Sequence, residues 1–292
     1  MKRVICSIVI PHYNIPTLLR RCLQSIPERD DVQVIVVDDC SPVGDRLMEL
    51  VPELQRCNVE LYSTSEGGSA GRARNVGICK AKGEWITFLD ADDLFTDYID
   101  CVIPELNSHS EDVLYFKSKS VMSDNLGLSS GRNIFEYHFN TYFESGNENP
   151  LRLEYDAPWG KFIRRSFIID HNILFDEVRY SNDTFFSAAI GVFANRIFVS
   201  SEILYIVTER AGSLTADKMK NIEEWQIRYL TALRVQKFLD KHNVRYKRYA
   251  FADFLLLMWG RNKRKFVKEF FKLSLKNKAR YIYYVFRSTI SK

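Results

Sequence analysis

The sequence contains no apolar run long enough to cross a bilayer. Its longest candidate, FLLLMW at 254–259, is far shorter than the roughly 20 residues that a membrane helix needs. The N-terminal stretch lacks a small-residue cleavage site and meets Pro11 after a short apolar run, so we expect no signal peptide. Six cysteines without a CxxC pair and five unclustered histidines argue against a Cys/His metal site and predict reduced thiols in a cytoplasmic protein.

Two nucleotide-binding signatures are also missing. No GxxxxGK[ST] is present, and no GxGxxG follows the first apolar segment. We therefore do not expect a P-loop protein or a dinucleotide-binding protein.

The charge is unevenly distributed along the 292 residues. The net charge is +4, but residues 217–292 carry +14 and residues 1–216 carry −10. This shift predicts a boundary between an N-terminal domain, 1–216, and a basic helical region, 217–292. Within the first we expect two halves, 1–107 and 108–216.

Apolar β-branched runs alternate with helical spacing over the first ninety residues. The predicted strands are 4–10, 32–39, 59–64 and 84–89, and the predicted helices are 18–26, 45–54 and 70–83, the last closing on Gly83 as its C-cap. Further on, RIFVS and ILYIV predict two strands, and the chain from about 218 predicts helices. The alternation indicates a doubly wound α/β sheet with ligands at the carboxyl ends of its strands, where PHYN, DDCS and DADD fall.

The segment FLDADD places three aspartates in four positions directly after an apolar run. In an extended segment, Asp90 and Asp92 would point the same way and share one Mg²⁺ or Mn²⁺ ion. Such an ion takes its remaining ligands from water and substrate phosphates, and Arg72 and Arg74 are candidate phosphate-compensating charges. The structural alternative, an N-cap role, is equally open for Asp39 and for Asp93.

Six segments, in this order, resemble the inverting GT-A glycosyltransferases of family 2. They are IVIPHYN, VIVVDDCS, AGRARNVGICKAKGEWITFLDADD, PWGKFIRRSFI, YSNDTFF and RAGSLT, and they span most of residues 4–216. The resemblance implies a GT-A fold with a Rossmann-like, mostly parallel sheet and a C-terminal helical extension. It further implies a base pocket lined by Pro11, Tyr13 and Asp39, with Asp38 beside it. Asp90 would contact the ribose and the metal, and Asp92 would ligate the metal. Arg210 and 213–215 would lie near the phosphates or help to close the site.

Asp183 matches the second acid of the family's Glu-Asp pair, which makes it the candidate catalytic base. A carboxylate opposite the leaving group can take the acceptor's proton as attack proceeds with inversion. The preceding residue is Asn182 instead of Glu, which supports a catalytically inactive nucleotide-sugar-binding protein as the alternative. The structural alternative for Asp183 is an N-cap of the following helix.

Trp159 and Lys161 are candidate acceptor or donor-sugar contacts, since an aromatic face suits the apolar surface of a sugar. A place for Trp159 in the core is equally open.

The basic tail interleaves Phe, Leu and Tyr with Lys and Arg at helical spacing. This pattern favours peripheral attachment to an anionic membrane, with a solvated helical face as the alternative. No nucleic-acid-binding module accompanies the charge, so we expect no nucleic-acid partner. Whether the tail forms a homodimer is left open.

The sequence therefore predicts a metal-dependent transferase that uses a nucleotide sugar, with UDP favoured, and a glycan or lipid-linked acceptor. A processive synthase is disfavoured because the chain has no QxxRW motif and no membrane channel, and a nucleotidyltransferase because its glycine-rich, basic signature is missing. The donor sugar, the acceptor and the linkage are not specified by the sequence.

Overall fold

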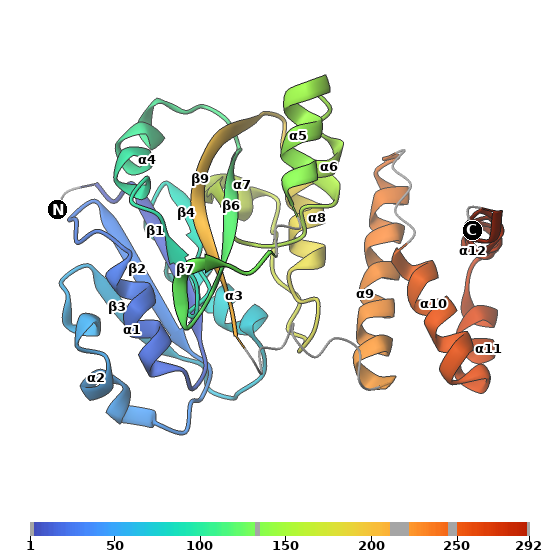
Figure 1. Cartoon of the computed structure of the whole chain (residues 1–292), viewed down its shortest axis with the longest axis horizontal. Coiled ribbons are helices and arrows are strands. Elements are labelled where there is room, and N and C mark those ends of the chain that lie inside the picture. The colour runs from blue at the N-terminus through green and yellow to red at the C-terminus, as the bar shows by residue number, and fades with distance from the viewer. Residues whose placement is uncertain (1–2, 132–134, 211–221, 245–249, 291–292) are drawn as a thin grey trace. The chain divides into compact units, whose positions relative to one another are not determined.

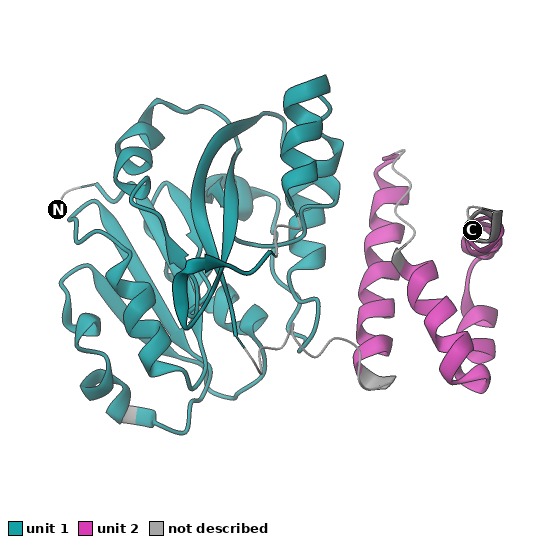
Figure 2. Ribbon diagram, viewed as in Figure 1, with its two compact units in different colours: residues 1–216 teal, residues 217–292 magenta. Residues whose placement is uncertain are grey.

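The computed structural model describes the 292 residues except 1–2, 132–134, 211–221, 245–249 and 291–292. The chain forms two compact units, Met1–Ala216 and Asp217–Lys292, coloured separately in Figure 2. Each unit has its own hydrophobic core and is described by itself.

Unit 1 is built on one nine-stranded sheet (Figure 1) with the order β3-β2-β1-β4-β8-β6-β9-β5, in which β7 pairs with β6. The strands are β1 (Cys6–His12), β2 (Val32–Asp38), β3 (Val59–Ser63), β4 (Trp85–Phe88), β5 (Leu94–Phe95), β6 (Val113–Met122), β7 (Asn125–Ser129), β8 (Lys161–Arg164) and β9 (Ile197–Glu209). The strands β3, β2, β1 and β4 are parallel, and antiparallel pairs enter with β8. The parallel half brings the carboxyl ends of β1, β2 and β4 to one edge.

Helices cover this sheet and connect its strands. They are α1 (Pro16–Gln24), α2 (Leu47–Leu50), α3 (Ala70–Lys80), α4 (Ile99–Glu105), α5 (Glu136–Ser145), α6 (Asn149–Leu153), α7 (Arg165–Asp170) and α8 (Thr184–Phe193), with 3₁₀ turns at Gly44–Arg46, Pro52–Gln55 and Leu106–Ser108. Helix α3 packs directly on β1, because a Cβ on Gly77 would lie 2.2 Å from Val9 Cγ1. The absence of a side chain there sets how close α3 comes to the sheet.

The predicted alternation of strands and helices is confirmed, and its details change in three places. The predicted helix 45–54 is a short helix, α2, between two 3₁₀ turns, because Pro52 disfavours helical geometry at Val51. The segments RIFVS and ILYIV form one strand, β9. A register shift against β6 accommodates the polar residues 200–202, so the strand continues through them. Helix α3 ends with Ala81 as its C-cap, and the Cβ of a side chain at Gly83 would lie 2.5 Å from Ser7 N. Gly83 thus permits close backbone packing, and its predicted role as a C-cap is wrong.

The described part of unit 2 is helical, as predicted. Its helices are α9 (Ile222–Lys241), α10 (Ala250–Arg261), α11 (Lys263–Lys272) and α12 (Leu275–Ile290). Its core includes Trp225, Phe251 and Met258. None of the helices in the described parts of the chain is long and apolar enough to span a membrane.

Candidate functional site

The carboxyl edge of the parallel strands gathers the polar residues that follow β1, β2 and β4. His12 lies opposite Asp38 in the register of β1 and β2. The His12 Nδ1 atom is 2.7 Å from Asp38 Oδ1, and its Nε2 atom accepts a hydrogen bond from the Ile15 N–H. The Nδ1 atom therefore carries the proton, and burial lowers the pKa of His12 despite the Asp38 charge.

Asp38 is committed to this local network. Its carboxylate also accepts hydrogen bonds from the Ser41 N–H at 2.8 Å and the Ser41 hydroxyl at 2.5 Å. The side chain is buried, so Asp38 shapes the loop beside the predicted base pocket and is not presented to solvent.

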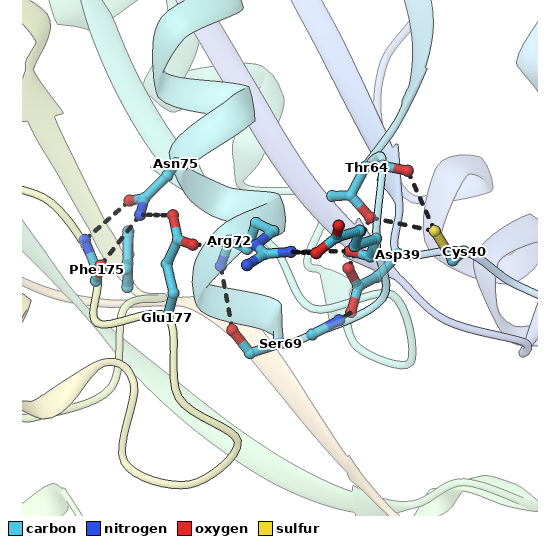
Figure 3. A network of polar contacts seen from close by, with 10 residues as sticks. Asp39, Cys40, Thr64, Ser69, Arg72, Asn75, Phe175 and Glu177 are labelled. Carbon is cyan, nitrogen blue, oxygen red and sulfur yellow. Dashed lines mark hydrogen bonds and ion pairs between the residues drawn. The ribbon is translucent and has the colours of Figure 1, made fainter.

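Asp39 points into a second network, drawn in Figure 3. Its two carboxylate oxygens accept from Thr64 Oγ1 at 2.8 Å and from the Gly68 N–H at 3.0 Å. Tyr13, which directly follows β1, is 58% exposed, and Pro11 is partly exposed within β1. The structure thus places Pro11, Tyr13 and Asp39 at the same sheet edge, and the tyrosine is the most exposed of the three.

The DADD segment is a tight turn. The Asp93 N–H donates to Asp90 O at 2.9 Å, and the intervening residues adopt turn geometry. The expectation that Asp90 and Asp92 lie on an extended stretch is therefore wrong. Both side chains remain partly exposed, at 29% and 26%.

Asp93 faces the interior and joins the turn to β9. Its carboxylate accepts from the Thr208 N–H at 2.6 Å and from the Tyr205 hydroxyl at 2.8 Å. Burial, together with the charges of Asp92 and Asp90, raises its pKa well above the ordinary value. Asp93 is therefore a structural residue, and the N-cap alternative for it is wrong, because the strand β5 and not a helix follows it.

Two arginines neutralise the exposed acids of the turn. The buried Arg74 donates to Asp90 Oδ1 at 2.6 Å and to Asn182 Oδ1 at 2.8 Å. Arg210 Nε lies 3.5 Å from Asp92 Oδ2. The segment 213–215, predicted beside the phosphates with Arg210, lies outside the described residues.

Asp183 stands one residue after Asn182 and directly before α8. Burial raises its pKa to about 6, with a further contribution from Asp156, while the charge of Arg74 acts in the opposite direction. Asp183 occupies the N-cap position of α8, but within the described residues its side chain makes no capping hydrogen bond there, so side-chain capping of α8 is not its role. No sequence motif marks Asp156, because only the fold brings it near Asp183.

Trp159 and Lys161 take different places. The Trp159 ring is partly buried and stacks on Tyr205 with ring centroids 4.7 Å apart. Lys161 is 1% exposed, and its Nζ donates to the carbonyls of Tyr155 and Ala157, both at 2.8 Å. This placement argues against a contact between Lys161 and a sugar. Burial lowers the pKa of Lys161 to about 7.

A divalent cation would find two carboxylates at this edge. Among the described residues, no group of three or more His, Cys, Asp or Glu is placed to hold a metal ion. Asp90 and Asp92 are hard oxygen donors, and burial together with the charge of Asp90 raises the pKa of Asp92. This donor set fits Mg²⁺ or Mn²⁺ only if phosphates and waters complete the coordination.

The residues of this edge lie within or close to a region that matches a known sequence family. The profile described as Glycosyl transferase family 2 matches residues 7–171. The chain belongs to this family. TarS of Staphylococcus aureus strain Mu50, a poly(ribitol-phosphate) beta-N-acetylglucosaminyltransferase, is 29% identical over 219 residues, covering 70% of this chain and 36% of TarS. Glycosyltransferase GlyA of Streptococcus pneumoniae serotype 4 is 22% identical, covering 72% of this chain and 31% of GlyA.

The chain thus spans about a third of the length of these two family members. Solved structures share its fold. The structure of S. aureus TarS 1–349 in complex with UDP-GlcNAc superposes with a TM-score of 0.65 at 23% identity, covering 95% of this chain and 78% of that one. The mannosyltransferase PcManGT of Pyrobaculum calidifontis, solved with GDP-Man and Mn²⁺, gives 0.53 at 16% identity, covering 96% and 79%. The predicted family and the predicted α/β fold of GT-A type with a helical extension are confirmed.

The Tyr205 hydroxyl generates a prediction about the turn. It donates to Asp93 and accepts from the Asp90 N–H, so Tyr205→Phe leaves a buried carboxylate and a backbone N–H each without one partner. We expect a loss of about 1–3 kcal/mol in the free energy of unfolding, measured by urea denaturation. Tyr137→Phe, on an exposed tyrosine, is the matched control and should leave stability unchanged.

Proposed function

We propose that the chain is a metal-dependent inverting glycosyltransferase that moves a sugar from a UDP-sugar to a hydroxyl of a glycan or lipid-linked acceptor in polysaccharide biosynthesis. One observation carries the proposal: Arg74 joins Asp90, at the end of β4, to the segment that presents Asp183. Arg74 thus links Asp90, the carboxylate proposed to face the sugar donor, to the segment of Asp183, the candidate base, at the carboxyl edge of the sheet. The TarS structures with UDP and with UDP-GlcNAc support UDP as the nucleotide.

The reaction exchanges one bond of the anomeric carbon for another. The acceptor oxygen attacks that carbon, its proton passes to a carboxylate oxygen of Asp183, and the bond to the diphosphate breaks with its electron pair leaving on UDP. A carboxyl group with a pKa of about 6 is ionised at neutral pH and still basic enough to accept this proton. Attack opposite to the leaving group inverts the anomeric configuration.

Charge balance favours a cation at the turn. Arg74 and Arg210 offset Asp90 and Asp92, so an arriving diphosphate brings negative charge that this set does not neutralise. Asp92, with Asp90 beside it, would hold Mg²⁺ or Mn²⁺, which when bound would stabilise the negative charge of the leaving diphosphate. The arginines would keep both carboxylates oriented toward the phosphates.

The inactive binding protein remains the rival, based on Asn182. The amide oxygen of Asn182 accepts a hydrogen bond from Arg74 at 2.8 Å, a contact that does not require a carboxylate at this position. Asp183 stays in place beside it. We therefore favour the enzyme.

The role of Asp183 predicts a pH dependence and a mutant phenotype. Because the carboxylate must be ionised, kcat/KM should fall about tenfold per pH unit below about 6 and level off above it. Asp183→Asn should lower kcat by roughly 10²–10⁴-fold and leave UDP affinity nearly intact. UDP release from UDP-sugars measures the rates, and calorimetry measures the affinity.

Asp170→Asn, at the exposed end of α7, is the control and should retain wild-type kinetics. Wild-type turnover in Asp183→Asn would contradict the assignment. UDP binding without any sugar release by the wild-type chain would favour the inactive rival.

We further propose that unit 2 attaches to an anionic membrane surface at the inner face of the cell membrane. Leu275, Ile282 and Phe286 recur on one side of α12 and are 85%, 61% and 66% exposed, while Phe271 on α11 is 71% exposed. Lys278 Nζ lies 5.6 Å from the centre of the Phe271 ring. Exposed apolar side chains among basic ones fit an interface of acyl chains and anionic headgroups.

Vesicle binding tests this attachment. The full chain should bind vesicles of phosphatidylcholine with phosphatidylglycerol and should bind phosphatidylcholine alone much more weakly. Replacing Phe271 and Leu275 by serine should weaken binding by roughly tenfold or more, because two apolar side chains no longer insert. The control replaces Leu126 and Leu128, which are exposed on β7, and should bind as wild type. Equal binding to both vesicle types, or no binding to either, would contradict the proposal.

A further inference from the structure

One face of α3 holds the segment that leads to Asp183. The side-chain amide of Asn75 pairs with the backbone of Phe175 in both directions: Nδ2 donates to Phe175 O at 3.0 Å, and Oδ1 accepts from the Phe175 N–H at 2.9 Å (Figure 3). The two hydrogen bonds match those that a residue of a neighbouring β-strand would make to Phe175. Because the amide supplies both a donor and an acceptor, it fixes the position and the orientation of the Phe175 peptide groups.

Two further residues of α3 contact the same segment. The backbone passes so close to Gly71 that a Cβ there would lie 2.1 Å from Asp176 O. Arg74 reaches Asn182 at 2.8 Å. Arg74 and Asn75 lie three and four positions after Gly71, so all three residues share one side of the helix.

The Phe175 side chain connects the segment to both parts of the proposed site. Its ring stacks on Phe186 of α8 with centroids 3.8 Å apart, and it meets Phe88 of β4 edge-on at 5.0 Å. Phe88 precedes the DADD turn by two positions, and Phe186 lies in the first turn of the helix that follows Asp183. A displacement of Phe175 would therefore change the distance between the turn and Asp183.

We propose that Asn75 and Gly71 are positioning residues for the transfer reaction, an inference that rests on the glycosyltransferase function proposed above. Neither residue has to touch a substrate. They fix the backbone of residues 175–182 against α3 and so determine where the Asp183 carboxylate stands relative to the phosphate-binding turn. A catalytic base must lie within hydrogen-bonding distance of the proton that it accepts. Residues that hold its backbone in place, as Asn75 and Gly71 do here, can set that distance to within a fraction of an ångström.

The test compares three variants of the full chain. Asn75→Ala removes both hydrogen bonds to Phe175 and should lower kcat by roughly 10–100-fold, with the dissociation constant for UDP within about twofold of wild type. Gly71→Ala forces the segment away and should show the same split between kcat and UDP affinity. Asp170→Asn, at the exposed end of α7 and outside both α3 and residues 175–182, is the control and should keep kcat within about twofold.

A second measurement reads the backbone directly. Hydrogen exchange at the Phe175 amide should accelerate in Asn75→Ala and stay slow in Asp170→Asn, with melting temperatures confirming that each variant is folded. Asn75→Gln keeps the amide one methylene further out, so its kcat should be intermediate, and it replaces Asn75→Ala if that variant does not fold.

Unchanged kcat in folded Asn75 and Gly71 variants would overturn the inference, as would equal losses of kcat and of UDP affinity. A wild-type chain that binds UDP but releases no sugar from UDP-GlcNAc or other UDP-sugars would instead refute the proposed function. In that case the exchange at Phe175 still reports whether Asn75 holds the segment.

Discussion

The ion pair between Arg74 and Asp90 is the interaction on which the geometry of the site depends. Arg74 is buried, so its charge has to be compensated inside the protein, and Asp90 supplies the opposite charge at 2.6 Å. Its second hydrogen bond, to Asn182, joins the end of β4 to the segment before Asp183. A single guanidinium thereby connects the proposed donor side of the site to the proposed base.

The three aspartates of the DADD turn show how neighbours in sequence acquire different functions. Asp93 turns inward and anchors the turn to β9, while Asp90 and Asp92 stay partly open to solvent, each beside an arginine. Inward hydrogen bonding of one acid reduces the repulsion among the three. The two open carboxylates are then balanced without surplus positive charge, and in the proposed function a divalent cation would neutralise the charge that an added diphosphate brings.

Local patterns in the sequence were enough to predict most of the fold, and tertiary contacts explain what they missed. Buried β-branched runs and helical spacing predicted β1 to β4 and α3, because each element buries a periodic face. The conformation of the DADD turn, the burial of Lys161 and the approach of Asp156 to Asp183 depend on packing between distant segments. The motif order located the candidate residues, whereas the connection through Arg74 became visible only in three dimensions.

The most direct test of this account is the affinity of the chain for UDP, measured by calorimetry with and without Mn²⁺, for wild type and for Asp92→Asn. The account predicts that Mn²⁺ strengthens UDP binding by roughly tenfold or more in the wild type, since two ligands that neutralise each other bind cooperatively. This dependence should disappear in Asp92→Asn. UDP binding that is equally strong with and without the ion in the wild-type chain would contradict it.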